Sequence, residues 1–133
     1  MSTMTPGWHL LAVACGGAVG AVLRYLVAAR WLGVATMPAW PWATFFVNCA
    51  GALAFGLLAV VLAASTTIND NLRLALMTGL LGAFTTYSTF SFELVRMLEL
   101  RAWGLAIGYG MGTMAACVSL AGLGLWLGRV LFE

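Results

Sequence analysis

Apolar residues fill most of this chain in four long runs, and polar residues gather in the short stretches between them. A helix that crosses about 30 Å of hydrocarbon takes roughly 20 predominantly apolar residues. Four runs reach that length, at residues 8–29, 39–64, 72–97 and 102–128. Their short connectors leave no room for a soluble domain. The pattern predicts one all-α integral membrane domain over residues 1–133, with four transmembrane helices in a lipid bilayer.

The third run differs from the others because it contains the sequence GAFTTYSTFSF, residues 82–92, with five Ser and Thr residues. Gly79, Gly82, Thr85 and Thr86 are poor residues for a helix interior. A broken helix at mid-membrane is tolerated only where its backbone is buried in protein or lines a cavity. These residues predict a break in the third helix, whose unwound carbonyls would attract a small hard cation. Alternatively, the hydroxyls could simply join two helices.

Few charges interrupt the runs, because charged residues make up 8% of the chain and hydrophobic residues 63%. Six Arg, four acids and no Lys leave a net charge of +2, which provides no basic surface for nucleic acid. The Arg residues divide weakly between the two predicted sides of the membrane: Arg73 and Arg129 against Arg24, Arg30, Arg96 and Arg101. A chain with so little bias could insert in both orientations, which suggests an antiparallel homodimer.

The fourth run carries small residues at every fourth position, namely Gly104, Gly108, Gly112 and Ala116. Spacing of this kind lets helix backbones approach closely in lipid. It is equally consistent with self-association and with packing inside one subunit.

Groups suited to enzyme catalysis are scarce. His9 is the only histidine, and Glu93 is the only acid well inside an apolar run. No nucleophile, base and orienting group can be assembled from neighbouring positions, so we do not expect an enzyme. Cys15, Cys49 and Cys117 lie in apolar runs without metal-ligand spacing, which predicts small buried side chains rather than a disulfide or a zinc site.

Uncharged hydrogen-bond donors recur at helical spacing in the second and fourth runs. Thr44 and Asn48 share one helix face, and Tyr109, Thr113 and Cys117 share another. A carboxamide near the middle of a span costs on the order of a few kcal/mol if unpaired, so Asn48 needs a partner helix or a passing ligand. N–H groups, O–H groups and aromatic edges carry partial positive charge. These faces therefore suit a small anion that must enter and leave.

Together these residues form a pattern that resembles the Fluc (CrcB) family of bacterial fluoride channels. The resemblance covers the whole length, through GGAVGAVLRY, FFVNCAGALAFG and GLLGAFTTYSTFSFE in the first three runs and the Tyr109 and Thr113 spacing in the fourth. It implies a dual-topology, antiparallel homodimer in the bacterial inner membrane, with two fluoride pores and a central sodium ion that is structural and not transported. The implied function is passive export of toxic fluoride from the cytoplasm.

The resemblance also implies roles for single residues. Backbone carbonyls of Gly82 and Thr85 from each subunit would hold the sodium ion, and Arg24 would be a structural charge near a helix end. The residues implied for the fluoride pore are Asn48, Tyr87, Ser88, Thr89, Phe90, Tyr109 and Thr113. Two positions depart from the family pattern, because Tyr87 stands where Phe is commoner and Cys117 stands where a third hydroxyl would continue the polar track. These departures leave the exclusion of chloride open.

Two other functions remain open on the residues alone. A small multidrug-type exporter also has four helices, but that class needs an acid within its first helix, where this chain has Arg24 and no acid. A non-conducting membrane assembly subunit would need only the small-residue stripe of the fourth run.

Overall fold

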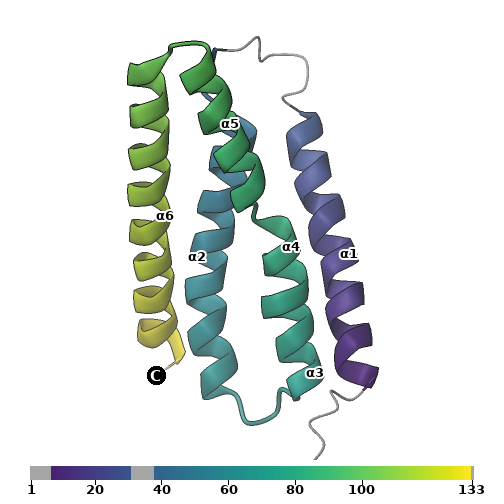
Figure 1. Ribbon diagram of the computed structural model, residues 1–133. Coiled ribbons are helices and arrows are strands. Elements are labelled where there is room, and N and C mark those ends of the chain that lie inside the picture. Colours follow the sequence, from purple (N-terminus) through teal and green to yellow (C-terminus); the bar gives the residue numbers. More distant parts are fainter. Residues whose placement is uncertain (1–6, 31–37, 133) are drawn as a thin grey trace, which may run out of the picture.

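The computed structural model describes residues 7–30 and 38–132, which form a bundle of helices with no strand in these two ranges (Figure 1). Three helices are long: α1 (Gly7–Ala29), α2 (Trp42–Ala64) and α6 (Trp103–Phe132). Between α2 and α6 the chain forms four shorter elements: α3 (Asp70–Arg73), the π-helix η1 (Leu74–Leu81), α4 (Gly82–Phe84) and α5 (Tyr87–Glu99). The all-helical prediction is confirmed for the described residues.

Helices α1, α2 and α6 are each long and apolar enough to cross a membrane. Helix α2 begins at Trp42 rather than at residue 39, because Pro41 occupies its N-cap. Helix α6 continues beyond residue 128 to Phe132. The third apolar run occupies residues 70–99 and is divided among α3, η1, α4 and α5, so that none of its helices reaches spanning length alone.

Helices α2 and α6 run in the same direction and pack closely along their length (Figure 1). A Cβ atom on Gly124 would lie 2.8 Å from the backbone nitrogen of Leu57, and one on Gly128 would lie 2.7 Å from Cβ of Val60. Real Cβ atoms do not come so close, so glycine is required at both positions. Close backbone approach of this kind stabilises helix pairs in lipid, where burial of apolar surface contributes little.

Helix α1 packs against η1 through the glycines of the sequence GGAVG. A Cβ atom on Gly16 would meet the carbonyl of Ala75, and one on Gly20 would meet the carbonyl of Leu80. The small-residue stripe of α6 behaves differently, because Gly104 and Gly108 are exposed on the single chain. Packing of α6 inside the chain uses its later glycines instead.

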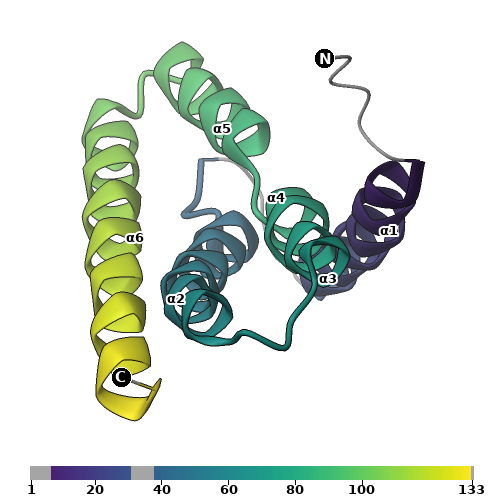
Figure 2. The ribbon, with the colours of Figure 1, turned by 90° about the horizontal axis from the view of Figure 1, so that it is seen from below.

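The third run changes neighbours partway along its length. Helix α4 lies beside α1, whereas α5 packs on α6, and Figure 2 shows the lateral step between them. Thr85 and Thr86 form that step in extended conformations, with φ and ψ of −74° and 155° and of −145° and 110°. Gly82 is helical, with φ −62° and ψ −36°. Helical geometry is thus lost at the threonine pair and not at the glycine that precedes it.

Candidate functional site

Asn48 on α2 forms two hydrogen bonds with the backbone of Thr86. The Asn48 Nδ2 donates to the Thr86 carbonyl at 3.1 Å, and the Thr86 N–H donates to Asn48 Oδ1 at 2.8 Å. This partly buried amide therefore has the interhelical partner that its position requires. The pair also orients the amide, because only its nitrogen can donate, and it leaves the second N–H of Nδ2 outside this interaction.

The threonine hydroxyls bond to backbone and side-chain groups at the step between α4 and α5. The Thr85 hydroxyl donates to the Leu81 carbonyl at 3.0 Å. The Thr86 hydroxyl accepts from the Thr89 N–H at 3.3 Å, which caps the N-terminus of α5, and it donates to Thr89 Oγ1 at 2.9 Å. The Thr86 hydroxyl thus replaces the Thr85 carbonyl as the partner of the Thr89 N–H, whereas the Leu81 carbonyl also keeps its helical donor, the Thr85 N–H, at 3.1 Å.

The backbone carbonyls of residues 82–85 lose their usual helical donors at this step. In a continuous helix the Gly82 carbonyl would accept from the Thr86 N–H, and the Thr85 carbonyl from the Thr89 N–H. Both N–H groups donate to side chains instead, one to Asn48 and the other to the Thr86 hydroxyl. Gly82 is exposed on the chain, and Thr85 is partly buried. The carbonyl oxygens of Gly82 and Thr85 are therefore available to other ligands.

A cavity of about 430 Å³ opens beside this step, and we call it the Asn48 cavity. Its lining residues come from α2, α5, α6 and the threonine pair, and none carries a formal charge: Asn48, Thr85, Thr86, Tyr87, Phe90, Leu94, Gly110, Thr113, Met114 and Cys117. The hydroxyl oxygen of Thr113 is buried and has no hydrogen-bond partner in the described part of the chain. An unpaired buried hydroxyl costs about 1–3 kcal/mol. A ligand that accepts a hydrogen bond from Thr113 would therefore be favoured there.

Four of the residues implied for the pore meet in the Asn48 cavity: Asn48, Tyr87, Phe90 and Thr113. The Phe90 ring centroid lies 5.9 Å from that of Tyr87 and 5.1 Å from that of Tyr109. Tyr109 is fully buried behind Phe90, whereas Tyr87 is 80% exposed on the single chain. The Tyr87 ring is therefore free to contact lipid or another subunit.

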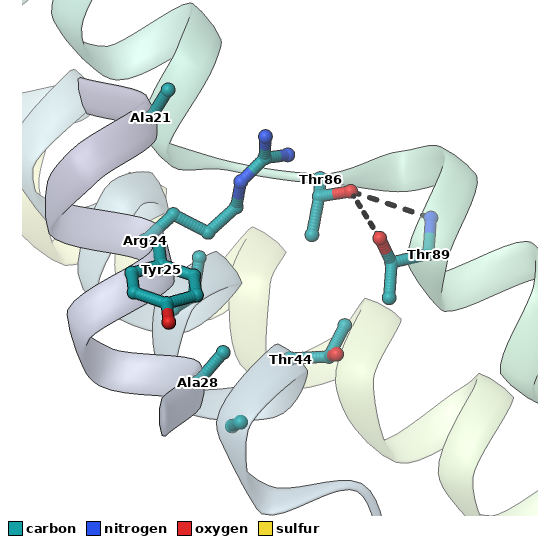
Figure 3. A pocket seen from close by; sticks show the side chains of 9 residues that line it. Ala21, Arg24, Tyr25, Ala28, Thr44, Thr86 and Thr89 are labelled. Atoms are coloured by element: carbon teal, nitrogen blue, oxygen red, sulfur yellow. Dashed lines mark hydrogen bonds between the residues drawn. The ribbon is translucent and has the colours of Figure 1, made fainter. Parts of the chain in front are cut away.

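Arg24 and Thr89 line a second cavity, of about 260 Å³, which we call the Arg24 cavity (Figure 3). The Arg24 side chain extends from α1 toward the segment that carries Thr86 and Thr89. Thr86 lines both cavities and so forms part of the wall between them. Ser88 is exposed and lines neither cavity.

Glu93 on α5 joins three helices, a role that the sequence analysis did not identify. Its Oε1 accepts from the Thr44 hydroxyl on α2, and its Oε2 accepts from the Tyr109 hydroxyl on α6, both at 2.7 Å. Thr44 and Tyr109 are themselves buried. The sequence did contain one indication of this role, because an acid inside an apolar run requires hydrogen-bond partners from other helices. Glu93 lines neither of the two cavities.

The sequence matches one protein family and several named relatives. Residues 11–125 match the family model described as CrcB-like protein, Camphor Resistance (CrcB). A protein named fluoride-specific ion channel FluC from Chloroflexus aurantiacus is 41% identical over 124 residues, which cover 90% of this chain and 98% of that protein. Proteins of the same name from Phenylobacterium zucineum and Bordetella petrii are each 45% identical, over 92% and 88% of this chain and 97% and 88% of their own lengths.

Proposed function

The chain belongs to the CrcB-like family of multi-pass membrane proteins, and we propose that it is a fluoride-selective channel through which toxic fluoride leaves the cytoplasm passively across the bacterial inner membrane. The observation that carries the proposal is the Asn48 cavity. Its wall combines the unpaired Thr113 hydroxyl, an oriented Asn48 amide and aromatic rings, with no charged side chain among its lining residues.

These groups suit a small anion that must pass rather than remain bound. Hydroxyl and amide donors replace water around a fluoride ion, and ring edges add weaker positive potential. Full positive charges would bind the ion too strongly for conduction. Glu93, whose two oxygens accept from Thr44 and Tyr109, is not among the residues that line the cavity.

A second copy in the opposite orientation would complete the pore. The Asn48 cavity is open on the single chain, and the exposed Tyr87 ring stands at its wall. Gly104 and Gly108 are exposed on α6, and within the described residues a Cβ atom on Gly104 would meet no atom within 4 Å. The weak Arg bias permits insertion both ways up. We therefore propose an antiparallel, dual-topology homodimer with two pores, in which residues 70–99 act as a fourth, interrupted span.

The carbonyls of Gly82 and Thr85 fit the structural sodium ion that the family resemblance implies. Hard cations prefer oxygen ligands, and unwound backbone carbonyls are known sodium ligands in membrane proteins. Both carbonyls lack their helical donors, and Gly82 is exposed where another subunit could share the ion. Bound sodium would join the subunits and would not be transported.

Substitutions at the two carbonyl positions test the sodium proposal. Thr85→Ala and Gly82→Ala both keep the backbone carbonyls, but Gly82→Ala adds a methyl group at an exposed position where the second subunit would approach the ion. On its own chain that methyl group would meet only the Met77 carbonyl, at 3.8 Å. We expect Gly82→Ala to weaken the sodium dependence of thermal stability more than Thr85→Ala does. Equal effects would identify the Thr85 side chain as the ligand instead.

Fluoride efflux from liposomes that contain the purified protein tests the function itself. We expect electrogenic loss of fluoride with no proton requirement, and a reduced rate for Thr113→Val, which keeps the side-chain shape and removes the unpaired hydroxyl. Thr67→Val makes the same chemical change at an exposed connector position and serves as the control. Efflux that required a proton gradient would indicate an exporter, and absence of flux would indicate a non-conducting subunit.

A further inference from the structure

Two cysteine thiols meet between α2 and α6. Cys49 lies seven residues, about two helical turns, before Gly56 on α2, and Cys117 lies seven residues before Gly124 on α6. Because Gly56 and Gly124 face each other at the closest approach of these helices, both cysteine side chains project into the same interface at the same level. The pair therefore belongs to the tightly packed part of the interface between these helices and does not depend on a flexible loop.

The thiol pair is reached from the Asn48 cavity. Cys117 lines that cavity, and Cys49 is buried on the facing side of the interface between α2 and α6. Met114, three residues before Cys117 on α6, lines the same cavity and brings a thioether to this wall. Both cysteines are free. The cavity wall thus presents sulfur where the family resemblance implies a third hydroxyl at position 117.

Sulfur ligands select soft metal ions, and thiolates bind them far more strongly than hydroxyls do. Two thiolates would also neutralise one divalent ion, which matters because an uncompensated charge is costly in a low-dielectric wall. A soft ion that accepts two-coordinate geometry, such as Hg²⁺, needs no further protein ligand. The described ranges contain no group of three or more His, Cys, Asp or Glu residues that could hold a metal. Ions that need more than two such ligands would therefore bind weakly at the cysteine pair.

We propose that Cys49 and Cys117 form a binding site for one soft divalent metal ion, entered from the Asn48 cavity, and that the bound ion blocks fluoride passage. In the binding step both S–H bonds break, two metal–sulfur bonds form and two protons pass to water, with no change in oxidation state. The blocking part rests on the proposed channel function, whereas the binding part does not.

Binding is tested with Hg²⁺ added as the acetate to purified protein that carries Cys15→Ser, which removes the separate, exposed thiol of α1. We expect one Hg²⁺ per chain, both thiols protected from titration, and retention of the ion through a glutathione wash. Cys49→Ala and Cys117→Ser, each in the same background, should lose retention by about 100-fold or more, because chelation by two linked ligands is lost. Two Hg²⁺ per chain in the parent, or equal retention in all three proteins, would overturn the site.

Block is tested by fluoride efflux in the same proteins, each normalised to its own metal-free rate. The parent should lose most of its efflux with Hg²⁺ and regain it with dithiothreitol, and the two single-thiol variants should be less inhibited. Retained Hg²⁺ with undiminished efflux would overturn the blocking part. A parent with no metal-free efflux would instead contradict the channel function, and the stoichiometry would still decide the metal site.

Discussion

Replacement of Asn48 by Asp changes one atom at the point where α2 meets the step between α4 and α5. The substitution preserves the acceptor of the Thr86 N–H and removes the donor to the Thr86 carbonyl. A carboxylate oxygen would then face the carbonyl oxygen across the 3.1 Å that now separates donor from acceptor. The same substitution places a negative charge at the wall of the Asn48 cavity.

A free energy can be assigned to each of these two effects. The Thr86 carbonyl belongs to a buried residue, so loss of its partner costs about 1–3 kcal/mol. Repulsion between the carboxylate and a fluoride ion about 4 Å away is about 4 kcal/mol at an effective dielectric constant near 20. Since 1.4 kcal/mol corresponds to a factor of ten, anion occupancy would fall about 1,000-fold. We therefore expect a large loss of fluoride flux together with a smaller loss of thermal stability.

Fluoride efflux from liposomes, recorded with a fluoride electrode, measures the first effect, and a thermal melt of the same preparation measures the second. Asn69→Asp is the matched control, because Asn69 caps α3 through its Oδ1, which accepts from the Leu72 N–H at 2.9 Å, and a carboxylate can do the same. Flux in Asn48→Asp equal to that of the parent would refute the reasoning. Equal loss in the Asn69→Asp control would show that the effect is not specific to the cavity.

Three further predictions follow from other contacts. Phe90→Ile keeps apolar volume but removes an aromatic edge from the Asn48 cavity, so efflux should fall sharply while the assembly stays intact. Phe92→Ile, at an exposed position outside the cavity, is the control, and equal flux in the two variants would exclude Phe90 from the pore. Tyr109→Phe removes one of the two hydroxyls bonded to the partly buried Glu93 carboxylate and should lower the free energy of unfolding by about 1–3 kcal/mol, whereas an unchanged denaturation midpoint would mean that this bond contributes nothing. Gly124→Ala should cost about 1–3 kcal/mol through overpacking against α2, but Gly122→Ala, with no atom within 4 Å, should leave the melting temperature unchanged. Identical melting temperatures would contradict the close approach of α2 and α6.

The arrangement of the polar groups was only partly predictable. Helical spacing placed Thr44 and Asn48 on one face of a helix, but their partners lie far along the chain, at Glu93 and Thr86. All the roles carried by resemblance, for the fluoride-pore residues, the sodium carbonyls and Arg24, stay predictions. Arg24, expected as a charge near a helix end, has its side chain in the wall of a cavity. No periodicity within a single run could reveal these pairings, because they join different helices.

The sequence alone determined the helical class, the apolar runs and the polar composition of the third run, because a bilayer requires long apolar helices and satisfied backbone groups. Tertiary structure alone decided where that run loses helical geometry. The Thr86 N–H bonds to Asn48 on another helix, and this contact, rather than the weak helix propensity of Gly82, stabilises the extended residues. Local propensities differ by only about 1 kcal/mol, so hydrogen bonds and close packing between helices determine the outcome.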